Sequence, residues 1–374
     1  MKKYFIFFSS IFAVFSLDSF AAGSQQYPNI SGQTLFQFKS DRVLSTNESG
    51  ISPNNAFINI ESGFSLNMNK NWSAKTLWKM NPANNYTTRD PVNPERTRTY
   101  LSTDRGFNPA DTGLLIEELK AQYEDEDMRF FIGKFDPSFG TAYKNNKRIG
   151  VFSQDITKDY ELREKLGGGV TALLEGGELS INTFFNDMTG LSGSINGRDR
   201  ENKNDGLAGN TGTLSSYTLS FQGDKFFGQE NWFYNLGYRS LGVNQGDSTT
   251  ERGRETGYVF GSEYLYKMGS NTSVIPFFEV SRINNFTGER GRNADYATFA
   301  LIGKYSGWTA SLSQIYRRIN QNQRTSNIRD HQTQLSLGYK FMNNFSVDVS
   351  RASLKESNHS AALFGVMLSY VYSY

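Results

Sequence analysis

Residues 362–374 read ALFGVMLSYVYSY and alternate between two kinds of side chain. One face of an extended chain would carry Phe364, Val366, Leu368, Tyr370, Tyr372 and Tyr374, and the other Gly365, Met367, Ser369, Val371 and Ser373. Successive side chains of a β-strand point to opposite faces. A strand with hydrocarbon on one side and water on the other must alternate in this way. The segment therefore predicts a β-strand that lies between lipid and water.

The same alternation recurs along the chain and predicts an all-β protein. It is clearest at Trp72–Met80 and at Phe345–Leu354. Sixteen strands are predicted: Asn29–Phe38, Ala56–Met68, Trp72–Met80, Leu114–Glu124, Met128–Gly133, Lys165–Glu175, Glu178–Asn186, Leu214–Gln222, Trp232–Leu241, Gly257–Tyr266, Ser273–Ile283, Tyr296–Ser306, Trp308–Arg317, His331–Phe341, Phe345–Leu354 and Ala362–Tyr374. A barrel with both ends in the periplasm requires an even number, and roughly 22 residues per strand and connection are ordinary for such a barrel. We expect a transmembrane antiparallel β-barrel of about 16 strands.

The connections between these segments alternate between short and long. The predicted short turns are Asn69–Asn71, Asp125–Asp127, Gly176–Gly177, Gly223–Asn231, Lys267–Thr272, Ser306–Gly307 and Met342–Asn344. The predicted long loops are Lys39–Asn55, Asn81–Gly113, Phe135–Glu164, Asp187–Thr213, Gly242–Thr256, Asn284–Asp295, Arg318–Asp330 and Lys355–Ala361. Barrels of the outer membrane have short periplasmic turns and long surface loops. A soluble β-sandwich is the alternative, but nothing in a sandwich forces this alternation.

The N-terminal residues have the pattern of a secretory signal. Lys2 and Lys3 precede the apolar run Tyr4–Leu17, and small residues follow up to Gly23. The run is shorter than the roughly 20 apolar residues of a spanning helix, so a membrane anchor is the weaker reading. We expect residues 1–22 to be a cleaved signal peptide and residues 23–374 to form the barrel.

The composition agrees with a barrel and excludes several other classes. The chain has 30 Phe, 20 Tyr and 35 Gly but a negative mean hydropathy, as alternating strands with aromatic girdles produce. There is no Cys, so no disulfide and no thiolate chemistry is expected. A formal net charge of +2 does not indicate a nucleic-acid partner. Glu124–Asp127 is acidic enough to suggest a divalent-metal site, but a solvated turn is the preferred interpretation, and no cofactor is expected.

The third long loop, residues 135–164, is the predicted functional element. Loops of this length usually carry a function or are disordered. Phe135–Gly140 contains a Pro and a Gly where a tight bend needs them, and Ile149–Leu162 supplies apolar side chains that can pack. A loop with both charges and apolar anchors can fold into the lumen and narrow it.

Two segments resemble Gram-negative outer-membrane porins. Gly133–Ala142, GKFDPSFGTA, is similar to the porin segment in which a strand turns into the inward-folded loop. Asp159–Leu162 followed by Lys165–Val170 is similar to the return into the next strand in porin-like proteins of alphaproteobacteria, and the terminal aromatic strand resembles the C-terminal signal of outer-membrane barrels. The resemblance implies a 16-stranded diffusion channel, often a trimer, that is constricted by its third loop. The chain ends in Tyr rather than Phe and lacks a dense arginine ladder, which leaves the selectivity open.

Strand parity predicts which charged side chains face the lumen. The candidate pore-lining and constriction residues are Lys75, Lys79, Glu118, Lys120, Arg129, Asp136, Lys144, Lys147, Arg148, Asp155, Asp159, Arg239, Glu279 and Arg317. The same parity directs Glu61, Glu263, Lys340 and Asp348 inward. Both signs of charge are present, so we expect a weakly selective pore for small hydrophilic solutes and ions. The expected partners are outer-membrane lipid, lipopolysaccharide and, for a trimer, further copies of the chain.

Two other functions fit a barrel. A surface adhesin or receptor would use the polar loops Asn81–Gly113 and Asp187–Thr213 and would not conduct. A barrel hydrolase needs a general base near its nucleophile. The chain has only His331 and His359, both beside predicted loops, so catalysis is not expected.

Overall fold

The structure is a computed structural model. It describes residues 26–47, 54–82, 112–144, 150–152, 156–193, 195, 207–226, 228–244, 251–321, 327–341, 344–356 and 359–374. The predicted signal peptide lies outside these residues. No helix among the described residues is long and apolar enough to cross a membrane.

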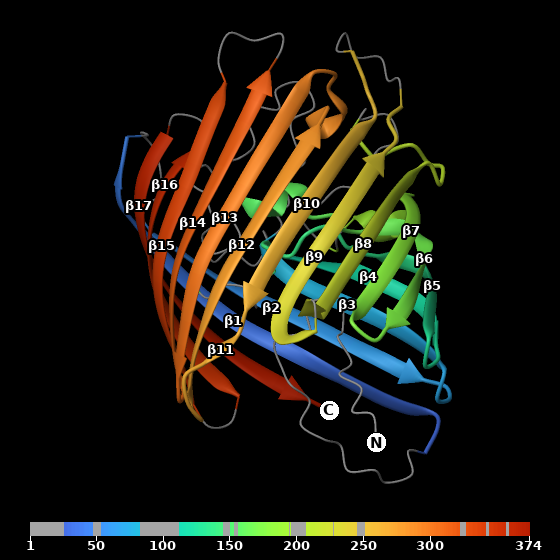
Figure 1. The fold of residues 1–374 in the computed structure, drawn as a ribbon, viewed down its shortest axis with the longest axis horizontal. Helices are drawn as coiled ribbons and strands as arrows, with labels where there is room; N and C mark the ends of the chain where they lie inside the picture. Colours follow the sequence, from blue (N-terminus) through green and yellow to red (C-terminus); the bar gives the residue numbers. More distant parts are fainter. Residues whose placement is uncertain are drawn as a thin grey trace.

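The described residues form one closed antiparallel sheet (Figure 1). Its strands are β1 (Asn29–Thr46), β2 (Asn54–Asn67), β3 (Trp72–Pro82), β4 (Thr112–Glu124), β5 (Met128–Phe135), β6 (Lys165–Leu174), β7 (Gly177–Asn186), β8 (Ser216–Phe226), β9 (Gln229–Leu241), β10 (Glu255–Tyr264), β11 (Tyr266–Lys267), β12 (Thr272–Asn284), β13 (Arg292–Tyr305), β14 (Trp308–Gln321), β15 (Ile328–Lys340), β16 (Phe345–Glu356) and β17 (His359–Ser373). Each strand pairs with its neighbours in sequence, and β1 pairs with β17, which closes the cylinder. Because β10 and β11 both pair with β12, they are one interrupted strand, and the barrel has the predicted 16 strands.

The outward face is apolar over the middle of the strands. Ile132 is 69 % exposed and Leu335 is 61 % exposed, whereas their sequence neighbours on the other face are buried or half-buried. In β17, Phe364, Tyr370 and Tyr372 are exposed, as the alternation predicts. Pairs of outward aromatic rings, such as Trp72–Tyr123 and Trp308–Tyr339, lie at the end of the barrel that carries the short turns, as in an interfacial girdle.

Short and long connections lie at opposite ends of the barrel (Figure 1). We call these ends the short-turn end, where β17 also finishes, and the long-loop end. At one short turn, Asp125 Oδ1 accepts the N–H groups of Asp127 and Met128 at 3.0 and 2.8 Å. These bonds hold the pKa of Asp125 below its usual value, and they show the acidic turn organising its own backbone.

Several predicted boundaries were wrong in the same direction. β1 continues to Thr46, so the predicted loop Lys39–Asn55 is shorter, and only residues 357–358 separate β16 from β17 where Lys355–Ala361 was predicted. At the other end, β8 and β9 run to residues 226 and 229, inside the predicted turn Gly223–Asn231. At the long-loop end the ladders extend beyond the apolar band. There the outward face no longer carries the apolar band, so the alternation that identifies a strand weakens although its backbone hydrogen bonds continue.

Candidate functional site

The candidate site is the connection between β5 and β6, residues 136–164, together with the inner wall that it contacts. It includes the 3₁₀ helix η6 (Thr157–Tyr160). We call this connection the third loop. Its described residues are 136–144, 150–152 and 156–164, and they contact inward-facing side chains of strands on the far side of the barrel.

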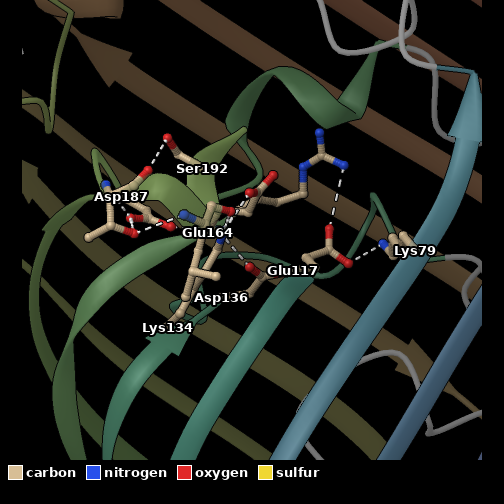
Figure 2. Close-up of polar contacts among 10 residues, drawn as sticks. Lys79, Glu117, Lys134, Asp136, Glu164, Asp187 and Ser192 are labelled. Atoms are coloured by element: carbon tan, nitrogen blue, oxygen red, sulfur yellow. Dashed lines mark hydrogen bonds and ion pairs between the residues drawn. The ribbon is translucent and has the colours of Figure 1, made fainter. Parts of the chain in front are cut away.

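An ion network holds the two ends of the third loop together (Figure 2). Lys134 Nζ lies 2.9 Å from Glu164 Oε2 and 2.9 Å from Asp187 Oδ2, and it donates to the Leu191 carbonyl at 2.8 Å. All three charged side chains are nearly or fully buried. Across the same base, the N–H of Glu164 donates to Asp136 Oδ1 at 2.8 Å. Because a buried charge is costly unless it is paired, this network fixes where the third loop leaves and re-enters the wall.

Asp136 lies where the two ends of the third loop meet, and its carboxyl group is perturbed by its surroundings. Burial, followed by the neighbouring carboxylates of Glu117, Glu118 and Glu161, raises the pKa of Asp136 well above its usual range. The backbone bond from Glu164 acts in the opposite direction but is the weakest of these effects. These surroundings therefore favour the protonated form of the Asp136 carboxyl group over the ionised form.

Glu279 of β12 anchors the third loop at Thr141–Ala142 and at Tyr160. Its carboxylate accepts the N–H groups of Thr141 and Ala142 at 2.6 and 2.9 Å, and the hydroxyl of Tyr160 at 2.7 Å. The Thr141 hydroxyl adds a further bond at 3.0 Å. Gly140 has φ +78°, and a Cβ there would lie 2.9 Å from Glu279 Oε1. Hydrogen bonds to an ionised group are about twice as strong as neutral ones, so Glu279 is a strong attachment point.

Arg239 of β9 holds the same part of the loop from a neighbouring strand. Its Nη2 pairs with Glu255 Oε1 at 2.6 Å, and its Nη1 donates to the Tyr160 carbonyl at 2.9 Å. The guanidinium also lies 4.7 Å from the centre of the Phe139 ring. A buried cation in this setting combines an ion pair, a hydrogen bond and a cation–π contact.

Arg317 of β14 is the third anchor. Its guanidinium is 2.5 Å from Asp159 in η6, 2.5 Å from Asp330 of β15 and 2.9 Å from Glu356 of β16. Tyr296 also donates its hydroxyl to Asp159 at 3.1 Å. One buried cation thus joins the loop to two strands, and without it three carboxylates would face one another.

The middle of the third loop reaches the inner face of β15–β17. The N–H of Val151 donates to Ser350 Oγ at 3.0 Å, and the N–H of Phe152 donates to Gln334 Oε1 at 2.9 Å. Gln332 donates to the Phe152 carbonyl. Val151 and Phe152 also pack against Leu363 on the inner face of β17.

Apolar packing supports these polar anchors. Phe139, Tyr143, Ile156 and Tyr160 of the loop form one buried cluster with inward side chains of β10, β12, β13, β14 and β16. Those side chains are Val259, Phe277, Ile283, Ala294, Tyr296, Ala300, Ile315, Ile319 and Leu354. The inner wall of an open pore is polar. Inward isoleucines near the long-loop end therefore mark the surface on which a loop packs.

The inner wall formed by β2–β4 carries charged side chains, some of which approach charged residues of the third loop. Lys79 pairs with Glu117 (Figure 2) and lies 3.8 Å from Glu61. From the loop, Arg163 Nη1 lies 3.7 Å from Glu117 Oε1, and the exposed Lys158 interacts electrostatically with Glu61. The register between β3 and β4 shifts at Leu77/Trp78, where Glu117 is the extra residue, so Glu117 and Glu118 are both buried.

The other predicted site residues have varied positions. Lys75 and Lys120 are register partners on β3 and β4, Glu118 pairs with Lys120 at 2.7 Å, and Arg129 pairs with Glu124 at 2.7 Å and Glu178 at 3.2 Å. Lys144 lies in the third loop, where its N–H donates to the Thr141 carbonyl at 2.9 Å. Lys147, Arg148 and Asp155 lie outside the described residues. The role of all these side chains in permeation stays a prediction.

Sequence reasoning missed several charged residues of this region. They are Glu117, Lys134, Lys158, Arg163, Glu164, Asp187, Glu255, Asp330 and Glu356. Glu117 could not be found because parity places only one of two consecutive glutamates inward, and a bulge is invisible in the sequence. Lys134 follows Gly133, whose φ of +139° interrupts the regular strand. Lys158 and Arg163 lie in a loop, where parity gives no information. The inward apolar residues Ile283 and Ile315 were the available signal that a loop packs on this wall.

Among the described residues, no contact supports a metal site or a hydrolase. Among the residues that the structure describes, no group of three or more acidic or histidine side chains is placed to hold a metal ion. His331 is the register partner of Lys355, and His359 that of Glu356.

Comparison with solved structures shows the fold. The chain is similar to the outer-membrane protein OpdK of Pseudomonas aeruginosa, with a TM-score of 0.53, 9 % identity, and coverage of 92 % of this chain and 99 % of that chain. It is also similar to OccK9 (OpdG) of the same organism, with a TM-score of 0.54, 10 % identity, and coverage of 92 % and 99 %. It is similar as well to a loop-deletion variant of OmpT, an outer-membrane protein of Vibrio cholerae, with a TM-score of 0.51, 9 % identity, and coverage of 93 % of this chain and 100 % of that chain. No protein-family model and no curated protein sequence matches the chain.

Proposed function

We propose that the protein is an outer-membrane porin, a channel for passive diffusion of small hydrophilic solutes and ions with weak charge selectivity. The observation that carries this proposal is the unequal use of the inner wall. The third loop is anchored on β9–β17, while β2–β4 carries Glu61, Lys79 and Glu117 opposite Lys158 and Arg163 of the loop. The similarity to solved outer-membrane barrels supports the location.

Weak selectivity follows from the pairing of the charges. Lys79 and Arg163 both approach Glu117, so the two signs alternate across a short distance. Charges in a water-filled constriction set ion preference through their field. Opposed charges produce a transverse field with little net sign, which favours small polar solutes over apolar ones and discriminates weakly between anions and cations.

The same proposal includes the path to the membrane and the assembly. Residues 1–22 are removed on export, the short-turn end faces the periplasm, and the strands contact outer-membrane lipid. A homotrimer is compatible with the outward face of β2–β7, where no exposed side chain toward the long-loop end is charged.

A barrel that does not conduct is the second candidate, in which the surface loops act as a receptor or adhesin. The contact of Val151 and Phe152 with the far wall favours it, because a loop that crosses the lumen leaves less room for water.

Planar-bilayer recording separates the two candidates. We expect discrete conductance steps from the refolded protein, a reversal potential near zero in a salt gradient, and block by some members of a panel of sugars, nucleosides, amino acids and phosphates. A strong preference for one ion sign would contradict weak selectivity. The absence of steps from correctly folded protein would contradict the channel itself.

A further inference from the structure

The outward face of the barrel is divided by charge near the long-loop end. On β2–β9, that half of each strand carries no exposed charged side chain. On the remaining strands, outward positions above the apolar band carry exposed cations: Arg282 (β12), Arg318 (β14), Arg329 (β15), Arg351 and Lys355 (β16), and Arg42 (β1). These strands lie side by side in the sheet. We call this set the cationic strip.

Strand register places its centre in one continuous row. Tyr258 of β10 is the partner of Arg282, Arg282 of Asp295, Asp295 of Arg318, and Arg318 of Arg329. Neighbouring strands lie about 4.8 Å apart, so three guanidinium groups project outward within the width of four strands. Figure 1 shows β12–β15 adjacent to one another with their long-loop ends together.

The row has more positive charge than the protein neutralises. Arg282 Nη1 is 3.6 Å from Asp295 Oδ1, the only acidic residue of the row. Arg318 and Arg329 are direct cross-strand partners, and like charges at such positions destabilise a sheet. Arg318 Nε donates to Asn320 Oδ1 at 2.9 Å, which is a neutral acceptor. Among the described residues, neither Arg318 nor Arg329 forms an ion pair. The row therefore presents a net positive charge that an external anion can neutralise.

An apolar groove adjoins the same row. It has a volume of about 720 Å³ and is lined on the outward face by Leu219, Leu236, Tyr258, Phe260 and Val280, with Arg282 and Asp295 at its border. Val280 and Phe260 are register partners directly below the pair Arg282 and Tyr258. A ligand that fits both features has an anionic group at one end and a hydrocarbon chain at the other.

We propose that the cationic strip binds the phosphate groups of a phosphorylated lipid of the outer leaflet, one acyl chain of which lies in the groove. Guanidinium groups recognise phosphate in a bidentate manner. A lipid headgroup meets the barrel at the upper edge of its apolar band, which is where the strip lies. This inference rests on the proposed outer-membrane location, but it does not depend on conduction.

The test uses the refolded full barrel in detergent and a titration with fluorescent diphosphoryl lipid A. Arg318→Gln/Arg329→Gln removes the unneutralised pair. Lys70→Gln/Lys267→Gln is the matched control, because it removes two exposed cations from the short-turn end. We expect the first variant to lose at least about tenfold in affinity and the control to bind like the wild type. Dephosphorylated lipid A and inorganic phosphate alone serve as further probes.

Each outcome decides the proposal. Weaker binding by R318Q/R329Q alone, together with poor binding of dephosphorylated lipid A, supports it. Equal affinity for all three proteins, or an equal loss in both variants, overturns it. Inorganic phosphate that binds as tightly as lipid A also overturns it, because the site would then take free anions. Heat-modifiable migration confirms that each variant is folded. Bilayer conductance of R318Q/R329Q is expected to equal that of the wild type, so a failure of the channel proposal would be seen separately.

Discussion

The two sides of the inner wall obey the same strand alternation but present different surfaces. On β1–β4 most inward positions are polar, with Leu77 and Leu115 as buried exceptions, and several of the polar side chains are hydrogen-bonded to each other, as in Asn55 to Asp41 at 3.1 Å and Asn59 to Gln37 at 3.0 Å. On β10–β16 they include Ile283, Ile315 and Leu354, which are buried under the third loop. One side suits water and the other suits a packed polypeptide. Strand alternation thus predicts which side chains point into the barrel. The polarity of those side chains indicates whether they contact water or the third loop.

Arg317→Gln is expected to have the largest effect on this difference. It leaves Asp159, Asp330 and Glu356 together without their shared cation, and breaking a buried ion pair in this way costs about 3–5 kcal/mol. We expect a lower unfolding temperature in detergent and a more protease-sensitive third loop. The matched control is Arg318→Gln, which alters the next residue but on the outward face. Equal protease sensitivity in the two variants would refute the anchoring role of Arg317.

Glu279→Ala should release the first half of the loop with a smaller loss of stability. The change removes the acceptor of four hydrogen bonds from the loop and leaves their buried donors unsatisfied, at about 1–3 kcal/mol for each donor that water does not reach. We expect larger and noisier single-channel conductance. Asp348→Ala is the control, because this inward carboxylate of β16 has no hydrogen bond or ion pair to any described residue. A conductance unchanged from the wild type would show that Glu279 does not hold the constriction.

Lys158→Glu tests whether the charges between the third loop and β2–β4 set the ion selectivity of the pore. Lys158 is an exposed cation of the third loop that interacts electrostatically with Glu61, and a unit charge acts on an ion in water 4–8 Å away with about 0.5–1 kcal/mol. We expect the reversal potential in a salt gradient to shift toward cation preference, by a few-fold in permeability ratio. Lys267→Glu, at the short-turn end, should leave it unchanged. A shift of the same size in both variants would place the selective region elsewhere.

The smallest effect concerns pH and the base of the loop. Because the pKa of Asp136 is raised in the folded protein, the stability gained from its protonation is fully present below the usual pKa of about 3.9 and is lost as pH rises through the raised value. Asp136→Asn keeps an acceptor for the Glu164 N–H and stays neutral. We expect the wild type, but not this variant, to lose on the order of 1 kcal/mol of stability over that range. Thermal unfolding in detergent at a series of pH values measures the difference, and parallel curves would contradict it.

Much of the fold could be predicted because a barrel strand has a strong local signature. Trp72–Pro82 and Phe345–Glu356 are strands because one face must be apolar, and the predicted inward positions of Arg239, Glu279 and Arg317 follow from the same parity. The strand ends near Thr46 and Glu356 could not be predicted, since above the apolar band the outward face is no longer hydrophobic and the alternation weakens. Backbone hydrogen bonds alone maintain the ladder there.

The site was predictable only where it belongs to the strands. The bulge at Glu117 and the irregular backbone at Gly133 reverse parity locally, and no residue type marks either event. The pairing of Lys134 with Glu164 and Asp187 joins three elements that are distant in sequence. Such contacts depend on how the third loop packs as a whole, which is a tertiary property.

We propose that the barrel encloses a water-filled path narrowed by the third loop. Single-channel recording of the wild type and of a variant lacking Lys144–Ser153 tests it most directly, because the deletion removes the contacts of Val151 and Phe152 with the far wall. We expect discrete steps for both proteins and a larger unit conductance for the deletion variant. No steps from folded wild-type protein, or the same unit conductance in both, would contradict it.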